Sequence, residues 1–385
     1  MSSRTNYRIG DIPFVFAPLN EAHNPEGIPD SISMNLECRD GVVSQVKSET
    51  TERVLDKAYS LGSAISGQMD DFGNGKDYAN DFLHWMDNAG VDLNGKRVLE
   101  IGCGTGYLMN EMERRGASCV GVEPGDSAEY GRKKYGVNIR REFFKPGNFS
   151  EKFDYIVFFG VLEHLYDRNA FLTGVKSLLK PNGGVLISVP NCEKNIEIGD
   201  ISMLLSEHWS YFTQKTLEYT LLGNDLIGDV MVSDLGNVLN AYVKKSDDSA
   251  SKRLLEQIPS ESEALLKAFY EKYTLKKVKM VDWFSKELVS GNSIGIYVPG
   301  RFINWLNIIS ESVDSINLRF IDDNKILSNT YYPGFDNPIE SLEDFMKRPT
   351  ETVLVCSYTF EDNIRKKLID AGYKGKVTSL RIVLE

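Results

Sequence analysis

Short apolar runs alternate with amphipathic segments through the middle of the chain. Four runs between Arg97 and Pro190 are almost wholly apolar, and they read RVLEIG, CVGVE, YIVFFG and GVLISVP. Strands that are buried on both faces have this composition, whereas half-buried strands alternate between apolar and polar positions. Segments with helical spacing lie between the runs, at residues 107–115, 128–135 and 169–179. The alternation predicts a doubly wound α/β domain around a parallel sheet.

The residues before this domain follow a different pattern. Four prolines within the first 50 residues favour short strands and ordered loops over long helices. Two helical stretches follow between Glu52 and Ala89, and the segment GSAISGQMDDFGNG (Gly62 to Gly75) separates them. Its small residues suit either a plain linker or a lid that approaches a ligand closely. In the lid interpretation, Tyr59 and the residues Ser66 to Met69 close over a bound molecule.

The residues after the domain begin with a long charged segment at 249–288, whose helical spacing predicts a connector. The strand–helix alternation resumes at Ile294. We expect strands at IGIYVPG, LRFIDDN, TVLVCSY and KVTSLRIVL, and helices at RFINWLNIISES and EDNIRKKLIDAG. This predicts a second, smaller α/β domain. The expected boundaries are 1–89 for an N-terminal extension and lid, 90–247 for the main domain, 248–292 for the connector and 293–385 for the accessory domain.

The composition of the chain argues against several classes of binding partner. Its 385 residues exceed one typical core, and its 44 basic and 55 acidic residues give a formal charge of −11. Without a dense Lys/Arg stripe, we expect no nucleic-acid binding. No apolar run approaches the roughly 20 residues that span a bilayer, so we expect no membrane segment. The five cysteines form no CxxC pair, so we expect a reducing cytoplasm, no disulfide framework and no bound metal. The oligomeric state is left open.

The strongest chemical signal is VLEIGCGTGYL, from Val98 to Leu108. An apolar strand leads into three glycines that alternate with Cys103 and Thr105, and a helix then begins. Glycines at such a turn let the backbone approach a ligand with no Cβ in the way. A nicotinamide-dinucleotide loop requires a further glycine three positions after the second one. Tyr107 and Met109 occupy the two positions where that glycine would stand, so the spacing argues against this class of cofactor.

Two carboxylates accompany the glycine turn. Glu123 ends the next predicted strand, where a carboxylate can accept hydrogen bonds from both hydroxyls of a ribose. Glu100 lies inside an apolar strand, where a cationic ligand would offset the cost of its burial. The pattern therefore favours a ligand that is cationic and carries a ribose, and S-adenosylmethionine has both properties.

The chain resembles the class I S-adenosylmethionine-dependent methyltransferases. The resemblance rests on EIGCGTG (Glu100 to Gly106), Glu123, FDYIVFFGVLEHL (Phe153 to Leu165) and LLKPNGGVLISVPN (Leu178 to Asn191). It implies that the glycine loop contacts the methionine part of the cofactor and that Glu123 binds the ribose. It also implies that Phe143 or its neighbours flank the adenine, and that Phe159 and Gly160 lie near the sulfonium. The implied cofactor residues are Glu100, Gly102, Cys103, Gly104, Gly106, Glu123, Phe143, Phe159, Gly160 and, in the lid, Tyr59.

The segment LLSEHWSYF (Leu204 to Phe212) holds one of four histidines in the chain and follows the last of the apolar strands. In this fold it lies over the methyl group of the cofactor, where a base is needed to deprotonate an acceptor. His208 suits that role, and Tyr211 would share its face of a helix while Glu207 would not. The alternative is that these side chains only pack a helix start. For His164, in VLEHL, ordering of the loop and direct ligand contact are equally open.

A narrower resemblance concerns the sugar C-methyltransferases that act on nucleotide-linked keto-sugars. They carry a similar E-H-x-S-Y-F segment, matched by Glu207 to Phe212, and their histidine is a candidate base. They also end in a small Rossmann-like domain, which residues 294–385 resemble. This chain departs from them in lacking a cysteine-rich zinc module before the methyltransferase domain. It also has Leu205 where they have a tyrosine.

We therefore expect a cytoplasmic S-adenosylmethionine-dependent methyltransferase acting in sugar biosynthesis, on a small molecule or a nucleotide-linked sugar. His208 is the candidate base, and Glu207 and Tyr211 would position the acceptor. Two alternatives remain open. The chain could be a cofactor-binding scaffold whose partner performs the chemistry, or a methyltransferase that acts on protein or RNA.

Overall fold

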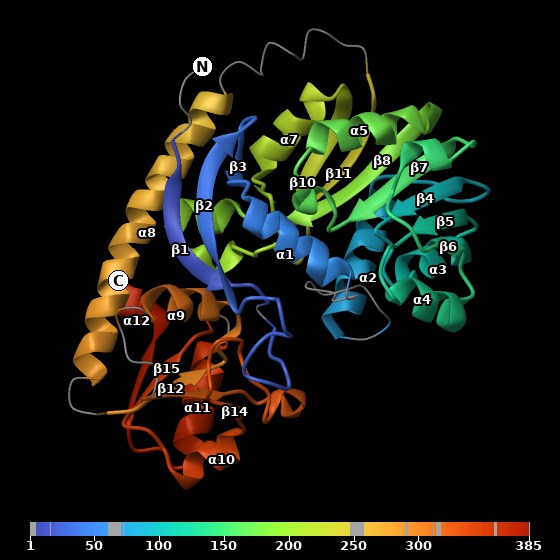
Figure 1. Ribbon diagram of the computed structural model, residues 1–385. Helices are drawn as coiled ribbons and strands as arrows, with labels where there is room; N and C mark the ends of the chain where they lie inside the picture. Colours follow the sequence, from blue (N-terminus) through green and yellow to red (C-terminus); the bar gives the residue numbers. More distant parts are fainter. Residues whose placement is uncertain are drawn as a thin grey trace.

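The computed structural model describes residues 5–15, 17–60, 71, 73–246, 258–288, 292–310, 312, 317–357 and 360–384. Most of the proposed lid, including Ser66 to Met69, lies outside the described residues, and so does the side chain of Tyr59. Within the described part, the strands form three sheets of four, seven and five strands. Figure 1 shows the long helix α8 (Ile258–Leu288) running along the four-stranded sheet toward the C-terminal domain.

The seven-stranded sheet is the centre of the main domain and confirms the doubly wound prediction. Its strand order is β10-β11-β8-β7-β4-β5-β6. Five neighbouring strands are parallel, in the order β8-β7-β4-β5-β6. Strand β11 runs antiparallel to both β8 and β10. Strand order reverses between β4 and β7, and ligands bind beyond the carboxyl ends of the strands at such a point. The strands are β4 (Arg97–Ile101), β5 (Ser118–Val122), β6 (Ile139–Arg140), β7 (Phe153–Phe159), β8 (Leu179–Pro190), β10 (Leu226–Val232) and β11 (Val238–Lys245).

Helices connect these strands, and the first three of them lie at the predicted places. They are α3 (Tyr107–Arg114), α4 (Ser127–Tyr135), α5 (Arg168–Ser177) and α7 (Gln214–Gly223). Asp167 caps α5 by accepting a hydrogen bond from the backbone N–H of Ala170, and Thr213 caps α7 in the same way through Thr216. The apolar strands are buried as expected, with Val98, Leu99 and Val185 fully enclosed.

The N-terminal extension forms an antiparallel sheet and two helices. The sheet contains β1 (Tyr7–Pro13), β2 (Ser31–Arg39) and β3 (Val42–Gln45). Its fourth strand, β9 (Ser210–Tyr211), comes from the segment Leu204 to Phe212, which we call the acceptor segment. The helices α1 (Glu49–Ser60) and α2 (Gly73–Asn88) match the two predicted helical stretches. The extension is therefore built into the site-bearing part of the chain.

The C-terminal domain has a parallel sheet in the order β14-β13-β12-β15-β16. One prediction here was wrong: KVTSLRIVL is not a continuous strand, because β16 ends at Ser379 and helix α12 begins at Leu380. Leu380 and Val383 pack into the core from α12, which α8 contacts. The elements are β12 (Ile294–Tyr297), α9 (Ile303–Ile309), β13 (Leu318–Ile321), β14 (Ile339–Glu340), α10 (Leu342–Lys347), β15 (Thr352–Val355), α11 (Glu361–Asp370), β16 (Lys376–Ser379) and α12 (Leu380–Leu384).

One hydrophobic core joins the N-terminal sheet, α8 and the C-terminal domain. It contains Met34 of β2, Phe269 of α8 and Trp305 of α9, together with Leu204 from the acceptor segment. The Nδ2 of the buried Asn304 donates hydrogen bonds to the carbonyls of Ile201 (3.0 Å) and Leu204 (2.8 Å). The C-terminal domain is thus fixed directly to the segment that we expect to meet the acceptor.

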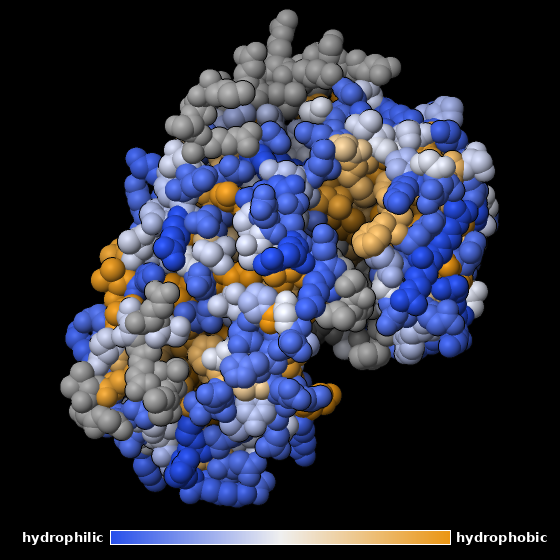
Figure 2. Space-filling view, viewed as in Figure 1, coloured by the Kyte–Doolittle hydropathy of each residue, from blue (hydrophilic) through white to orange (hydrophobic). Residues whose placement is uncertain are grey.

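Exposed apolar side chains are scattered over the described surface, among them Ile326 and Ile369. Among the described helices, none is both long and apolar enough to cross a membrane. All five cysteines are free thiols. Figure 2 shows a mainly hydrophilic face, with apolar atoms gathered in a hollow between the N-terminal part and the central domain.

Replacing Asn304 tests the attachment of the C-terminal domain. Asn304→Ala leaves two buried carbonyls without this donor, so we expect the free energy of unfolding to fall by about 2–4 kcal/mol. Urea denaturation followed by circular dichroism measures the change. The control is Asn88→Ala, which removes an exposed amide hydrogen-bonded to His84. Equal urea midpoints for the two variants would contradict the attachment.

Candidate functional site

The glycine loop after β4 has a backbone that only glycine adopts without strain. Gly102, Gly104 and Gly106 have φ angles of 69°, 52° and 73°. A Cβ on Gly102 would lie 2.6 Å from Val161 Cγ2, and one on Gly106 would lie 2.7 Å from Val137 Cγ2. The loop therefore packs against the loop that follows β7. Both loops lie at the carboxyl edge of the central sheet, where a ligand is expected.

Glu123, one residue beyond β5, is joined to this loop through its carboxylate. Its Oε2 accepts a hydrogen bond from the backbone N–H of Gly104 (3.1 Å), and its Oε1 accepts one from Gly125 (2.8 Å). The carboxylate thus holds the glycine loop next to the end of β5. This position is consistent with the predicted ribose contact, which stays a prediction.

Glu100 is a buried carboxyl group on β4. Its side chain is 3% exposed, and its Oε2 has no hydrogen-bond partner among the described residues. Burial, and next the negative charge of Glu123, raise the pKa of Glu100 to about 8. Cys103 is also buried, and its sulfur lies against Gly121 of β5, so only its backbone remains for ligand contact. A cationic ligand near Glu100 would favour its ionised form.

The remaining predicted cofactor residues lie in different surroundings. Phe159, at the end of β7, packs edge-to-face against Phe82 of α2 with ring centroids 5.5 Å apart. Gly160 has a φ of 65°, and its N–H donates to the carbonyl of Ser188 on β8. Phe143 is 62% exposed, and the structure does not bring its side chain together with the glycine loop. Its neighbour Phe144 packs instead into the core under α5.

The acceptor segment is a turn and a short strand, so the expectation that His208 and Tyr211 share a helix face was wrong. Strand β9 pairs Ser210 with Ser44 and Tyr211 with Val43 of β3. The N–H of Trp209 donates to the carbonyl of Glu163 (2.8 Å), and the carbonyl of Trp209 accepts from Gln45 (3.2 Å). These partners lie outside the segment, and backbone groups that bond there cannot also form a helical ladder.

The three predicted catalytic side chains are nevertheless buried on this segment. His208 is 4% exposed, Glu207 is 2% exposed, and the Tyr211 hydroxyl donates to the carbonyl of Leu205 (3.2 Å). The rings of His208 and Tyr211 have centroids 6.3 Å apart. Burial, and next the neighbouring His164, lower the pKa of His208 well below its usual range. The imidazole of His208 is therefore neutral, which is the form that accepts a proton.

Two further groups, one buried and one half-buried, complete a cluster that the sequence identified only in part. Glu163 and His164 follow β7, and the rings of His164 and His208 meet edge-to-face with centroids 4.7 Å apart. His164 Nδ1 lies 3.8 Å from Glu207 Oε2. Burial raises the pKa of Glu163 to about 8 and lowers that of His164 to about 4. The VLEHL motif of the resemblance contains both residues, but only His164 was considered for ligand contact.

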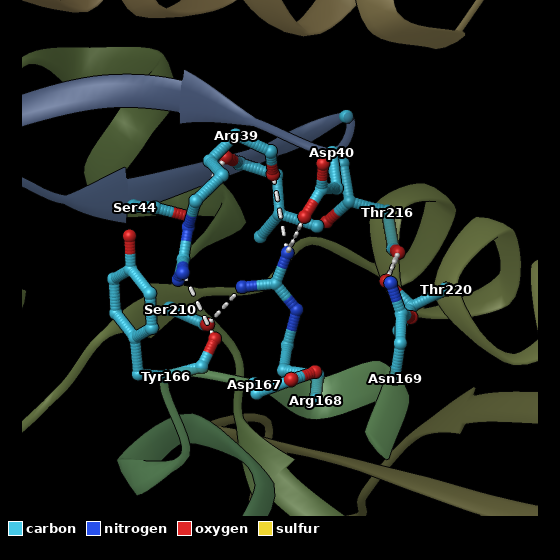
Figure 3. Close-up of polar contacts among 12 residues, drawn as sticks. Arg39, Asp40, Ser44, Tyr166, Asp167, Arg168, Asn169, Ser210, Thr216 and Thr220 are labelled. Atoms are coloured by element: carbon cyan, nitrogen blue, oxygen red, sulfur yellow. Dashed lines mark hydrogen bonds and ion pairs between the residues drawn. The ribbon is translucent and has the colours of Figure 1, made fainter. Parts of the chain in front are cut away.

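Behind this cluster, a buried arginine holds strand β9 in place. Arg168, at the start of α5, donates to the hydroxyl of Ser210 (2.6 Å) and to the carbonyl of Arg39 (3.1 Å). Figure 3 shows its guanidinium between Ser210 and the β2–β3 turn, with Arg39 beside Tyr166. Arg39 lies 3.8 Å over the Tyr166 ring and donates to its carbonyl. Burial, and next the charge of Arg39, lower the pKa of Arg168 to about 10, which leaves it charged.

Comparison with known proteins finds matches to the central part of the chain. Residues 77–226 match a family model described as a methyltransferase domain. Ubiquinone biosynthesis O-methyltransferase of Pseudomonas fluorescens (strain Pf0-1) is 32% identical over 117 residues, which are 28% of this chain and 50% of that protein. The same enzyme of Bradyrhizobium diazoefficiens is 34% identical over 105 residues, 26% of this chain and 42% of that protein. The match thus spans about half the length of these relatives.

Two solved structures resemble a part of the chain. PH0226 protein from Pyrococcus horikoshii OT3 covers 46% of this chain and 94% of its own, with a TM-score of 0.39 and 14% identity. A structure described as a putative S-adenosylmethionine-dependent methyltransferase from Listeria monocytogenes covers 44% of this chain and 100% of its own, with a TM-score of 0.36 and 15% identity.

Replacing Arg168 tests its hold on β9. Arg168→Ala removes two buried charge-assisted hydrogen bonds, so we expect the free energy of unfolding to fall by about 2–4 kcal/mol. Thermal or urea denaturation measures the change. Arg114→Ala is the control, because Arg114 is 71% exposed in its pair with Glu111. We expect that variant to unfold like the unchanged protein, and an Arg168 variant that did the same would refute the assignment.

Proposed function

We propose that this chain, whose residues 77–226 form a methyltransferase domain of the S-adenosylmethionine-dependent class, transfers a methyl group to a small-molecule acceptor. The main support is the position of His208. It is buried on a segment that is hydrogen-bonded to the loop after β7, and that loop packs on the glycine turn. A base therefore lies beside the expected cofactor site.

The proposed cofactor residues follow from this arrangement. Gly102 to Gly106 and Gly160 leave room for the methionine part, and Glu123 binds the ribose. S-adenosylmethionine supplies the methyl group and carries a positive charge on its sulfonium. Glu100 is buried near this loop, and the ligand charge offsets the cost of ionising it.

The proposed mechanism is an in-line displacement. The acceptor atom forms a bond to the methyl carbon as the bond from that carbon to the sulfonium sulfur breaks, and S-adenosylhomocysteine leaves. His208 takes the proton that the acceptor loses. His208 is neutral in the free protein and has a nitrogen lone pair for the proton, although its burial weakens it as a base. Glu207 and Tyr211 position the acceptor. Positioning matters because methyl transfer depends chiefly on alignment of the two reacting atoms.

The proposed acceptor is a sugar, free or nucleotide-linked, or a related biosynthetic intermediate. The motif Glu207 to Phe212 supports this class through its resemblance to sugar C-methyltransferases. The relatives named above are O-methyltransferases of ubiquinone biosynthesis, whose name also points to a small acceptor. The burial of His208 favours a small acceptor over a folded protein or RNA.

The alternative of a cofactor-binding scaffold makes a different prediction for the purified protein. A scaffold binds S-adenosylmethionine without methylating any small molecule. Mass spectrometry of the co-purified ligands, followed by incubation with radiolabelled cofactor and a metabolite extract, separates the two functions. A labelled small-molecule product supports the enzyme. Cofactor binding without any labelled product supports the scaffold.

Replacing His208 tests the base. With His208→Ala we expect kcat to fall by about 100-fold or more, because general-base catalysis contributes on that order. Cofactor affinity, measured by calorimetry, should stay within about threefold, because His208 is not among the proposed cofactor residues. His84→Ala is the matched control, since His84 is exposed on α2. Unchanged turnover of the His208 variant with bound cofactor would show that the base lies elsewhere.

The pKa of Glu100 predicts a pH dependence of cofactor binding. The folded-state pKa of about 8 exceeds the ordinary value of 4.5, so the carboxyl is mostly protonated at pH 6. A cationic cofactor binds the ionised form better, so the affinity should rise between pH 6 and 7.5, by up to about tenfold per pH unit.

In Glu100→Gln this rise should disappear, because the variant has no proton to lose at that position. Calorimetric titrations of both proteins across the pH range measure the two slopes. If the affinities of the two proteins rise equally with pH, ionisation of Glu100 does not contribute to cofactor binding. The same shift makes the free protein lose stability as pH rises from about 4.5 to 8, and the variant should lose less.

A further inference from the structure

Three side chains beside the proposed acceptor site have donor atoms that converge. One donor atom from each of Glu163, His164 and His208 lies within 4.8 Å of the other two. His164 Nε2 is 3.9 Å from Glu163 Oε1. Glu163 and His164 come from the loop after β7, and His208 comes from the acceptor segment, which the Trp209–Glu163 backbone hydrogen bond holds against that loop.

The polar atoms of this cluster are incompletely satisfied. Glu163 is 2% exposed, and its Oε2 has no hydrogen-bond partner among the described residues. Nor does the buried Nδ1 of His164 have one within that part of the chain. A buried carboxylate without donors costs a large part of its hydration energy, and a cation restores it. Arg301 is the cation whose charge acts on His208. No donor among the described residues reaches Glu163 Oε2, so a cation bound there would complete the cluster.

We propose that Glu163, His164 and His208 bind one divalent transition-metal ion of the zinc class. Two imidazoles and one carboxylate form a donor set that zinc accepts. Zinc ligands lie about 2.0–2.2 Å from the ion, which puts them about 3–4 Å from one another. The three side chains have to close in modestly from their present separations.

Binding of the ion would regulate the proposed methyl transfer, and this step rests on the proposed function. A ring nitrogen of His208 that is bonded to a metal cannot accept a proton. The metal-bound protein therefore lacks its base, and methyl transfer should fall as the site fills. This inference departs from the expectation of no metal, which rested on cysteine spacing alone.

The test begins with binding, independently of activity. Full-length protein is freed of metal with a chelator and titrated with Co²⁺, followed by visible absorption, and with Zn²⁺, followed by calorimetry. We expect one equivalent to bind, and we expect Glu163→Gln and His164→Ala each to weaken binding by about tenfold or more. His84→Ala is the control for adventitious histidine binding and should bind as the unchanged protein does.

X-ray absorption on the zinc complex of the unchanged protein covers the case in which a variant fails to fold. We expect two imidazole ligands and one carboxylate. No binding, a ligand set without imidazole, or affinities that Glu163→Gln and His164→Ala leave unaltered would each overturn the site.

Activity then separates this proposal from the function on which it rests. Turnover of the unchanged protein should be full in chelator and should fall with Zn²⁺ at the concentration that fills the site. Metal binding without turnover in chelator would contradict the proposed function and leave the site standing. Undiminished turnover at full occupancy would overturn the regulatory step.

Discussion

The backbone of residues 200–212 is held from three sides, and the geometry of the candidate site depends on this constraint. The loop after β7 accepts from Trp209 N–H, strand β3 pairs with β9, and Asn304 of the C-terminal domain donates to Leu204. Each contact leaves a buried polar group unsatisfied if it is lost. Displacement of either flanking domain should therefore disturb His208 before it disturbs the central sheet.

Much of the fold could be predicted from the sequence, because buried parallel strands and connecting helices leave strong local patterns. The apolar runs at β4, β5, β7 and β8 identify the sheet, and the glycines after β4 identify its ligand-binding edge. The pairing of β9 with β3 could not be predicted. Ser210 and Tyr211 are too short a run to signal a strand, and their partners lie about 170 residues earlier. The segment Leu380 to Leu384 was predicted as a strand and is a helix. A short apolar run of that length is typical of a strand and of a buried helix alike, so the sequence could not decide between them.

The residues of the candidate site also differ in how far the sequence could predict them. The type of residue and its place in the fold were enough to predict Glu100, Glu123 and His208. Each lies at the carboxyl edge of the sheet or on the segment above it. Phe143 or its neighbours were expected at the adenine from the family resemblance alone, and this stays a prediction. The side chain of Phe143 is exposed, and that of Phe144 packs against the core. Glu163 lies in the VLEHL motif, but no local pattern encodes the three-dimensional meeting of its side chain with His164 and His208.

Two carboxyl groups with a pKa near 8 lie on neighbouring strands of this sheet, Glu100 on β4 and Glu163 just after β7. Burial alone makes each of them costly to ionise, and a positive charge beside it would lower that cost. In the proposed function, the cofactor sulfonium supplies one such charge, next to the glycine loop. At Glu163, on the acceptor side, a proton or the proposed metal ion would supply the other. On these proposals, the site has one half that binds a permanent cation and one half whose charge can change.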